Sequence, residues 1–183
     1  MKQLAMEVRS VDTDGRTVQG ICVPYNETTY RVPGGERIQR GAFKRSIDHR
    51  SDKIPLCRGH SSDMVMGWSR SFTEDTAGLL GDFVVNQGDD GDKLLRDVHN
   101  GYLPAMSVCF EATRNGIGRG DDGVLEIREA KLVEVSLVGI PAYEGATVTA
   151  VRSAENLAEL LAPFENLPKW DLDPLPPLRY VYR

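Results

Sequence analysis

The chain has 183 residues, of which 40% are hydrophobic and 27% charged, and its formal net charge is −5. This is the composition of a soluble globular protein, and the acidic balance argues against nucleic acid as the main partner because phosphate binding needs a basic face. No apolar run approaches the roughly 20 residues of a membrane span. The three cysteines, Cys22, Cys57 and Cys109, form no CxxC pair. We therefore expect a protein of a reducing cytoplasm with no disulfide framework, no metal and no cofactor.

Most of the chain is predicted to form short β-strands. Alternating apolar residues predict strands at 3–10, 17–25, 64–72, 78–86, 105–113, 124–138 (with a break near Ala130) and 146–152. Apolar residues at helical spacing predict two short helices, at 41–47 and 92–100. The polar segment 26–41 and the glycine-rich segment 114–123 are predicted to be loops. Because many short strands must hide their edges, we expect a mainly β fold with a few helices, built as a closed or nearly closed β-barrel.

The character of the sequence changes after Arg152. Three leucines at helical spacing predict an amphipathic helix: Leu157, Leu160 and Leu161. The closely spaced prolines that follow disfavour a packed strand or helix and predict an extended tail. We therefore expect a β-barrel domain over residues 1–152 and a C-terminal helix with a proline-rich tail over residues 153–183.

Two of the predicted strands carry a polar side chain opposite an apolar stripe. Ser107 lies opposite the apolar stripe of residues 105–110, and Glu134 lies opposite that of residues 133–138. His60 follows a glycine after a short apolar run. A hydroxyl, an imidazole and a carboxylate are the groups of a nucleophile, a base and an orienting acid. The three residues are therefore candidates for a hydrolytic triad.

Each of these residues also has a purely structural explanation. A serine within a strand is usually a packed hydroxyl group, and a histidine after glycine is usually a loop residue. A carboxylate is costly to bury without a partner, so Glu134 must face water or be paired. A salt bridge from Glu134 to Lys131 or Arg128 on the barrel surface is the alternative to a catalytic role.

Several motifs together resemble the prohead proteases of tailed bacteriophages, the serine proteases that mature HK97-type capsids. They span about residues 17–152 in the family's order: Gly20-Ile21-Cys22-Val23-Pro24-Tyr25, Glu36-Arg37-Ile38, Gly41-Ala42-Phe43, Gly59-His60, Ser107-Val108-Cys109-Phe110, Glu134-Val135-Ser136-Leu137-Val138 and Pro141-Ala142. The resemblance implies a barrel of the herpesvirus-protease (assemblin) type, with His60 as the family histidine, Ser107 as nucleophile and Glu134 as third member. Cys109 stands where the family usually has glycine, on the face of Ser107.

The resemblance also implies a function. It implies a serine endopeptidase that cleaves the scaffold segment of the major capsid protein, and itself, inside the immature capsid in the host bacterial cytoplasm. A homodimer is favoured because the assemblin relatives are active as dimers. We look for oxyanion-binding backbone N–H groups in the turn after the Glu134 strand, at Gly139, Ile140 and Ala142. The alternative is a catalytically inactive barrel that acts as a scaffold or capsid-binding assembly module.

Overall fold

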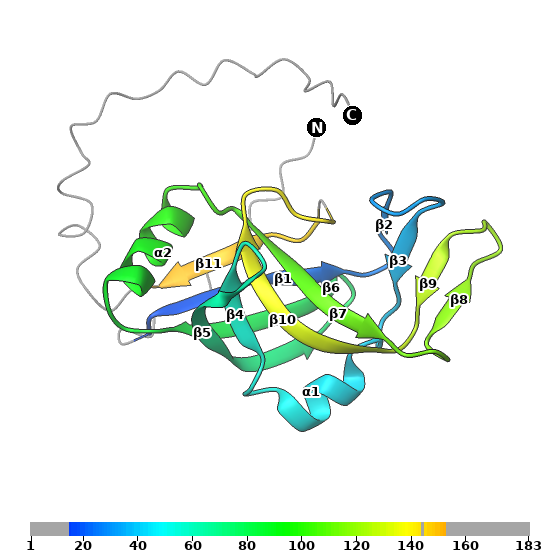
Figure 1. Cartoon of the computed structure of the whole chain (residues 1–183), viewed down its shortest axis with the longest axis horizontal. Helices are drawn as coiled ribbons and strands as arrows, with labels where there is room; N and C mark the ends of the chain where they lie inside the picture. Colours follow the sequence, from blue (N-terminus) through cyan, green and yellow to red (C-terminus); the bar gives the residue numbers. More distant parts are fainter. Residues whose placement is uncertain (1–14, 144, 153–183) are drawn as a thin grey trace, which may run out of the picture.

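The structure is a computed structural model, and it describes residues 15–143 and 145–152. These residues form eleven strands and two helices, with the strands arranged in two sheets (Figure 1). The predicted mainly β class with a few helices is confirmed. The predicted strand at 3–10 and the predicted helix and tail of 153–183 lie outside the described residues.

The larger sheet has seven strands in the order β11-β1-β6-β5-β4-β10-β7. Its strands are β1 (Thr17–Pro24), β4 (Pro55–Arg58), β5 (Ser61–Glu74), β6 (Gly78–Val85), β7 (Ala105–Ala112), β10 (Ala130–Val138) and β11 (Val148–Arg152). Neighbouring strands pair antiparallel, except that β4 and β10 are parallel. Because β10 lies between β4 and β7, it brings the three sequence-predicted site residues into one region of the sheet.

The smaller sheet has four short strands in the order β2-β3-β9-β8, at the right of Figure 1. They are β2 (Thr28–Thr29), β3 (Glu36–Ile38), β9 (Leu125–Ile127) and β8 (Ile117–Arg119). Three of them fall in the segments that we predicted to be loops: β2 and β3 in 26–41, and β8 in 114–123. Strands of two or three residues are too short to show an alternating pattern, so periodicity could not reveal them.

The two helices cover different parts of the larger sheet. The first, α1 (Lys44–Arg50), begins three residues later than predicted because Gly41 has a φ of +85°, which no right-handed helix accommodates. The Ser46 hydroxyl at its centre accepts a hydrogen bond from the backbone N–H of Leu132 at 2.9 Å and so attaches α1 to β10. The second, α2 (Asp89–His99), packs against β5 and β11.

The larger sheet curls strongly into a half-barrel that does not close, so the closed form of the predicted barrel is wrong (Figure 1). In the described part of the chain, its edges meet only where residues 104–106 contact residues 146–148, through one isolated bridge and two backbone hydrogen bonds. Farther along β7, the buried ring of Phe43 packs edge-on against Phe110 with ring centroids 5.8 Å apart. Side chains preceding α1 therefore cover the inner face where closure would require another strand.

The core lies on the inner side of this curled sheet, and Phe83 is one of its largest fully buried side chains. We expect Phe83→Ala to lower the free energy of unfolding by about 3–5 kcal/mol, because it removes a ring that packs edge-on against Phe72 and leaves a cavity. Urea unfolding measures the loss. The matched control is Val84→Ala on the outer face of the same strand, 45% exposed, which should cost less than about 1 kcal/mol. Equal losses would contradict this assignment of inner and outer faces.

Candidate active site

His60 occupies a two-residue turn between β4 and β5. Arg58 pairs with Ser61 across this hairpin, and Gly59 and His60 both have a φ of +61°. Positive φ at both central residues is typical of the type I′ turn, whose twist matches that of the flanking strands. Histidine adopts this conformation only where its surroundings hold it there. Here the backbone N–H of His60 donates to the hydroxyl of Ser136 at 2.9 Å, which stabilises the turn.

Glu134 on β10 holds the imidazole ring of His60. The His60 Nδ1 and Glu134 Oε1 atoms lie 2.6 Å apart, and the Ser136 hydroxyl donates to Glu134 Oε2 at 2.6 Å. Hydrogen bonds thus run from the His60 backbone through Ser136 and Glu134 back to the His60 ring. The side chain of Glu134 is 11% exposed and that of His60 is 41% exposed. The carboxylate is shielded from water and satisfied by donors, as a buried charge requires, while the imidazole reaches solvent.

Ser107 on β7 faces the same side of the sheet. The register places Ser107 directly opposite Ser136, and Cys109 opposite Glu134. Residues opposed in this way have Cβ atoms about 4.5–5.5 Å apart. Ser107 is only 5% exposed, and its hydroxyl makes no hydrogen bond with any residue that the structure describes, His60 included. The structure therefore brings Ser107 to the face of the His60–Glu134 pair and leaves its hydroxyl unbonded.

The turn after β10 is held through its carbonyl groups by side chains from the segment between β1 and β3. The Thr29 hydroxyl donates to the carbonyl of Ala142 at 2.7 Å, and the Arg31 guanidinium donates to that of Pro141 at 2.8 Å. In the described part of the chain, three N–H groups of this turn donate no hydrogen bond: those of Gly139, Ile140 and Ala142. The turn therefore offers fixed backbone with free donors.

A cavity of about 570 Å³ opens beside the His60–Glu134 pair and is bordered by Cys57 and Cys109. Burial, with the neighbouring charge of Glu134, raises the pKa of Cys57 to about 11. Burial and the charges of Glu134 and Glu111 also raise the pKa of Cys109. Both thiols stay protonated at neutral pH, so neither competes with Ser107 as a nucleophile. Cys109, where the family usually has glycine, lies on the wall of this cavity.

The salt bridge that we considered as the alternative for Glu134 is absent from the described residues. Lys131 pairs with Glu111 at 3.1 Å, and Arg128 pairs with Glu126 at 2.8 Å. The alternative for Glu134 is therefore wrong, and its partners are His60 and Ser136 instead.

Sequence reasoning missed Ser136. It stands two residues after Glu134 in a predicted strand, and that spacing alone places both side chains on the same face.

Within the described ranges, no three His, Cys, Asp or Glu side chains are grouped so that they could hold a metal ion. Neither α1 nor α2 is long and apolar enough to cross a membrane.

A sequence model of the family described as caudovirus prohead serine protease matches residues 4–160. The chain belongs to this family. Its membership makes the prohead protease a serine peptidase. No curated protein matches the sequence.

The prohead protease is also similar in fold to solved viral proteases. The varicella-zoster virus protease is 17% identical, with 84% of this chain and 70% of that chain covered and a TM-score of 0.45. A Kaposi's sarcoma herpesvirus protease with an allosteric inhibitor is 11% identical, with 84% and 85% covered and a TM-score of 0.46. The bacteriophage T4 capsid assembly protease is 12% identical, with 72% and 79% covered and a TM-score of 0.49. Because likenesses this distant carry no functional argument, the family assignment rests on the sequence match.

Proposed function

We propose that this prohead serine protease cleaves the scaffold segment of the major capsid protein, and itself, inside the immature capsid in the host bacterial cytoplasm. Family membership supplies the reaction class. The observation that carries the proposal is the hydrogen-bonded pair of His60 and Glu134 on the sheet face that also presents Ser107. Acyl transfer by serine requires an orienting acid, a base and a nucleophile. The buried carboxylate of Glu134, the solvent-accessible imidazole of His60 and the unbonded hydroxyl of Ser107 are proposed for these three roles.

The proposed reaction begins with the tautomer of His60. Because the Glu134 carboxylate accepts a hydrogen bond from Nδ1, that nitrogen carries the proton and Nε2 has a free lone pair. Nε2 takes the proton of Ser107 as its Oγ attacks the peptide carbonyl, and Glu134 stabilises the imidazolium that forms. Nε2 then gives this proton to the leaving amine, which leaves Ser107 acylated. Water attacks this ester as Nε2 takes its proton and returns it to Ser107 Oγ, and the new carboxyl terminus is released. A Ser–His bond that is unmade without substrate fits this role, since catalytic contacts often tighten only when substrate binds.

The proposed oxyanion site is the turn that follows β10. Val138, the last residue of β10, pairs with Ala105, which stands two residues before Ser107. The turn therefore begins close to the strand that carries the nucleophile. The free N–H groups of Gly139, Ile140 and Ala142 are the candidate donors to the negatively charged oxygen of the tetrahedral intermediate.

Ser136 is proposed as a positioning residue. We expect Ser136→Ala to lower kcat about tenfold to a hundredfold with little change in KM, because the His60 turn loses its acceptor and Glu134 loses a donor. The matched control is Ser69→Ala, which removes another buried hydroxyl that accepts a backbone N–H, that of Ile54, and should leave kcat unchanged. A change in stability alone, with kcat unmoved, would contradict the role of Ser136.

The substrate proposal is tested by co-expressing the full-length chain with the capsid protein of the same phage. We expect mass spectrometry to find cleavage within the scaffold segment and within the protease, and neither cleavage with Ser107→Ala. A fluorophosphonate probe applied in parallel separates the possible failures. Labelling of Ser107 without capsid cleavage would mean a peptidase with another substrate. No labelling at all would favour the inactive assembly module.

The proposal includes a homodimer. The support is the leucine stripe of the predicted helix after Arg152, because an apolar helix face needs a surface to cover it. We expect sedimentation of the full-length chain to depend on protein concentration, and truncation after Arg152 to weaken association and lower the activity of dilute protein. If the full-length and the truncated chain associate equally, residues 153–183 have no part in self-association.

A further inference from the structure

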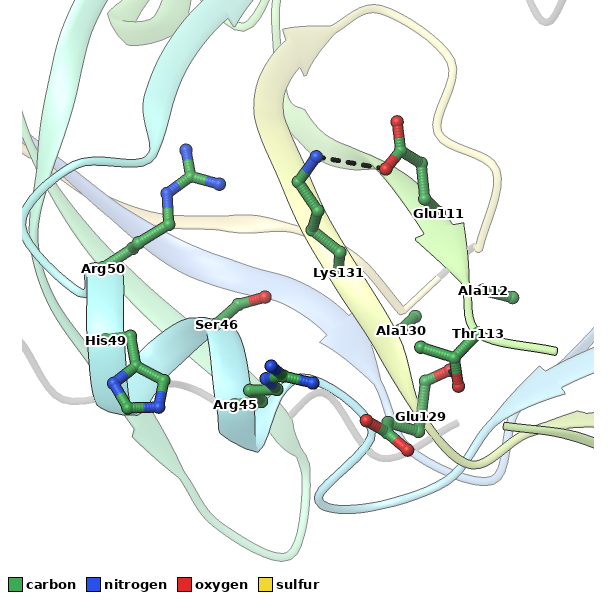
Figure 2. Close-up of a pocket in the computed structure, with 10 residues that line it drawn as sticks. All are labelled: Arg45, Ser46, His49, Arg50, Glu111, Ala112, Thr113, Glu129, Ala130 and Lys131. Carbon is green, nitrogen blue, oxygen red and sulfur yellow. Dashed lines mark hydrogen bonds and ion pairs between the residues drawn. The ribbon is translucent and has the colours of Figure 1, made fainter. Parts of the chain in front are cut away.

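A second cavity, of about 470 Å³, lies between α1 and the distal ends of β7 and β10 (Figure 2). None of the proposed catalytic residues lines it. Arg45 and Arg50 border it from the helix, and Glu111 and Lys131 border it from the strands. The methyl groups of alanines at the strand ends add an apolar part to its wall.

Part of the wall of this cavity lies on the sheet face of the active site. Ser107, Cys109 and Glu111 alternate along β7 and share one face, and Lys131 is paired with Glu111 on β10. At roughly 3.3 Å per residue, Glu111 lies about 13 Å along the strand from Ser107. An extended peptide that runs along these strands from the nucleophile covers this distance with three or four residues.

Positive charge predominates in the cavity, although the protein as a whole is acidic. Neither Arg45 nor Arg50 forms an ion pair with a residue that the structure describes, whereas Lys131 pairs with Glu111. Both partners of that pair are more than half exposed, so it contributes little and Lys131 can exchange its partner. In Figure 2, Arg50 and Lys131 extend to the same side from opposite walls. Glu129 is the remaining carboxylate of the lining, which leaves one cation in excess.

We propose that this cavity is a specificity subsite for an acidic side chain of the polypeptide substrate, three or four residues from the scissile bond. The inference rests on the proposed cleavage at Ser107. A carboxylate suits a guanidinium group such as that of Arg45 or Arg50, because a guanidinium can donate two parallel hydrogen bonds to it.

The first test uses a library of tryptic peptides from a denatured proteome, in which acidic residues remain intact. The full-length chain is incubated with the library, and the sequences around the new termini are read by mass spectrometry. We expect Asp and Glu to be enriched at one position, three or four residues from the cleaved bond. Cleavage without such enrichment would overturn the subsite and leave the peptidase in place. No cleavage of any peptide would count against the proposed function instead.

The second test reverses the charge of the cavity. Three peptides are compared: a Glu-containing peptide chosen from the library and its counterparts with Gln or Lys in place of Glu. The native chain should cleave the Glu peptide with a kcat/KM about tenfold higher than that of the Gln peptide. The double variant Arg45→Glu/Arg50→Glu should reduce this ratio to about one and cleave the Lys peptide best, while the Gln peptide is cleaved at the native rate. The milder double variant Arg45→Gln/Arg50→Gln should reduce the ratio without the reversal. Arg119→Glu, on exposed β8, is the matched control and should keep the native ratio. An unchanged ratio in both double variants would exclude the subsite.

Discussion

Replacing Ser107 with alanine is expected to lower kcat for peptide cleavage about a millionfold and to abolish labelling by a fluorophosphonate. The reason is that the proposed reaction passes through a covalent bond to Ser107 Oγ, and no neighbouring group replaces it. Cys109 shares its strand face but carries a thiol whose pKa is raised by burial, so it supplies no thiolate at neutral pH. The measurement is single-turnover cleavage of a peptide selected from the library.

His60→Ala should produce a loss of the same size, and the double variant Ser107→Ala/His60→Ala should be no worse than either. A hydroxyl without its base, and a base without its hydroxyl, are equally inactive, so the two losses do not add. Urea unfolding of each variant shows whether the fold is kept, and Ser69→Ala serves as the control for removing a buried hydroxyl in the same sheet. Losses that add independently would mean that Ser107 and His60 do not act together.

Glu134→Gln is expected to lower kcat about a thousandfold to ten-thousandfold and so to retain more activity than either variant above. The amide is nearly the same size as the carboxylate, but it can donate a hydrogen bond to Nδ1 and stabilise the wrong tautomer of His60. It also carries no charge to stabilise the imidazolium. Because the carboxylate orients and does not react, the nucleophile and the base stay in place.

The division of the loss between kcat and KM separates this role of Glu134 from a role in substrate binding. The loss in Glu134→Gln should appear in kcat and leave KM nearly unchanged, because the carboxylate acts on the imidazole and not on the bound peptide. Asp121→Asn, in the exposed turn between β8 and β9, removes a carboxylate far along the chain from the site and should leave kcat unchanged. Wild-type turnover by Glu134→Gln would remove Glu134 from the mechanism.

Local pattern in the sequence was sufficient for the elements that carry the site. Ser107 and Glu134 stand opposite apolar stripes in strands long enough to alternate, and the structure places both on the outer face of β7 and β10. Burial of one face of a strand determines where every side chain points, so this part of the site was predictable. The type I′ turn at Gly59-His60 was not predicted, because the sequence signals of this turn are Asn-Gly, Asp-Gly and Gly-Gly, and Gly-His is none of them.

The sequence by itself determined the family, the mainly β class and the residue types of the proposed triad. Only the tertiary structure decided that the sheet stays open, because Phe43 before α1 covers an inner surface that another strand could have covered. It also decided which partner each charge takes: Glu134 binds His60 and Ser136, and Lys131 binds Glu111. These choices depend on strand order and register across residues far apart in the chain. Periodicity reports which face a side chain occupies, but it carries no information about which strand lies beside it.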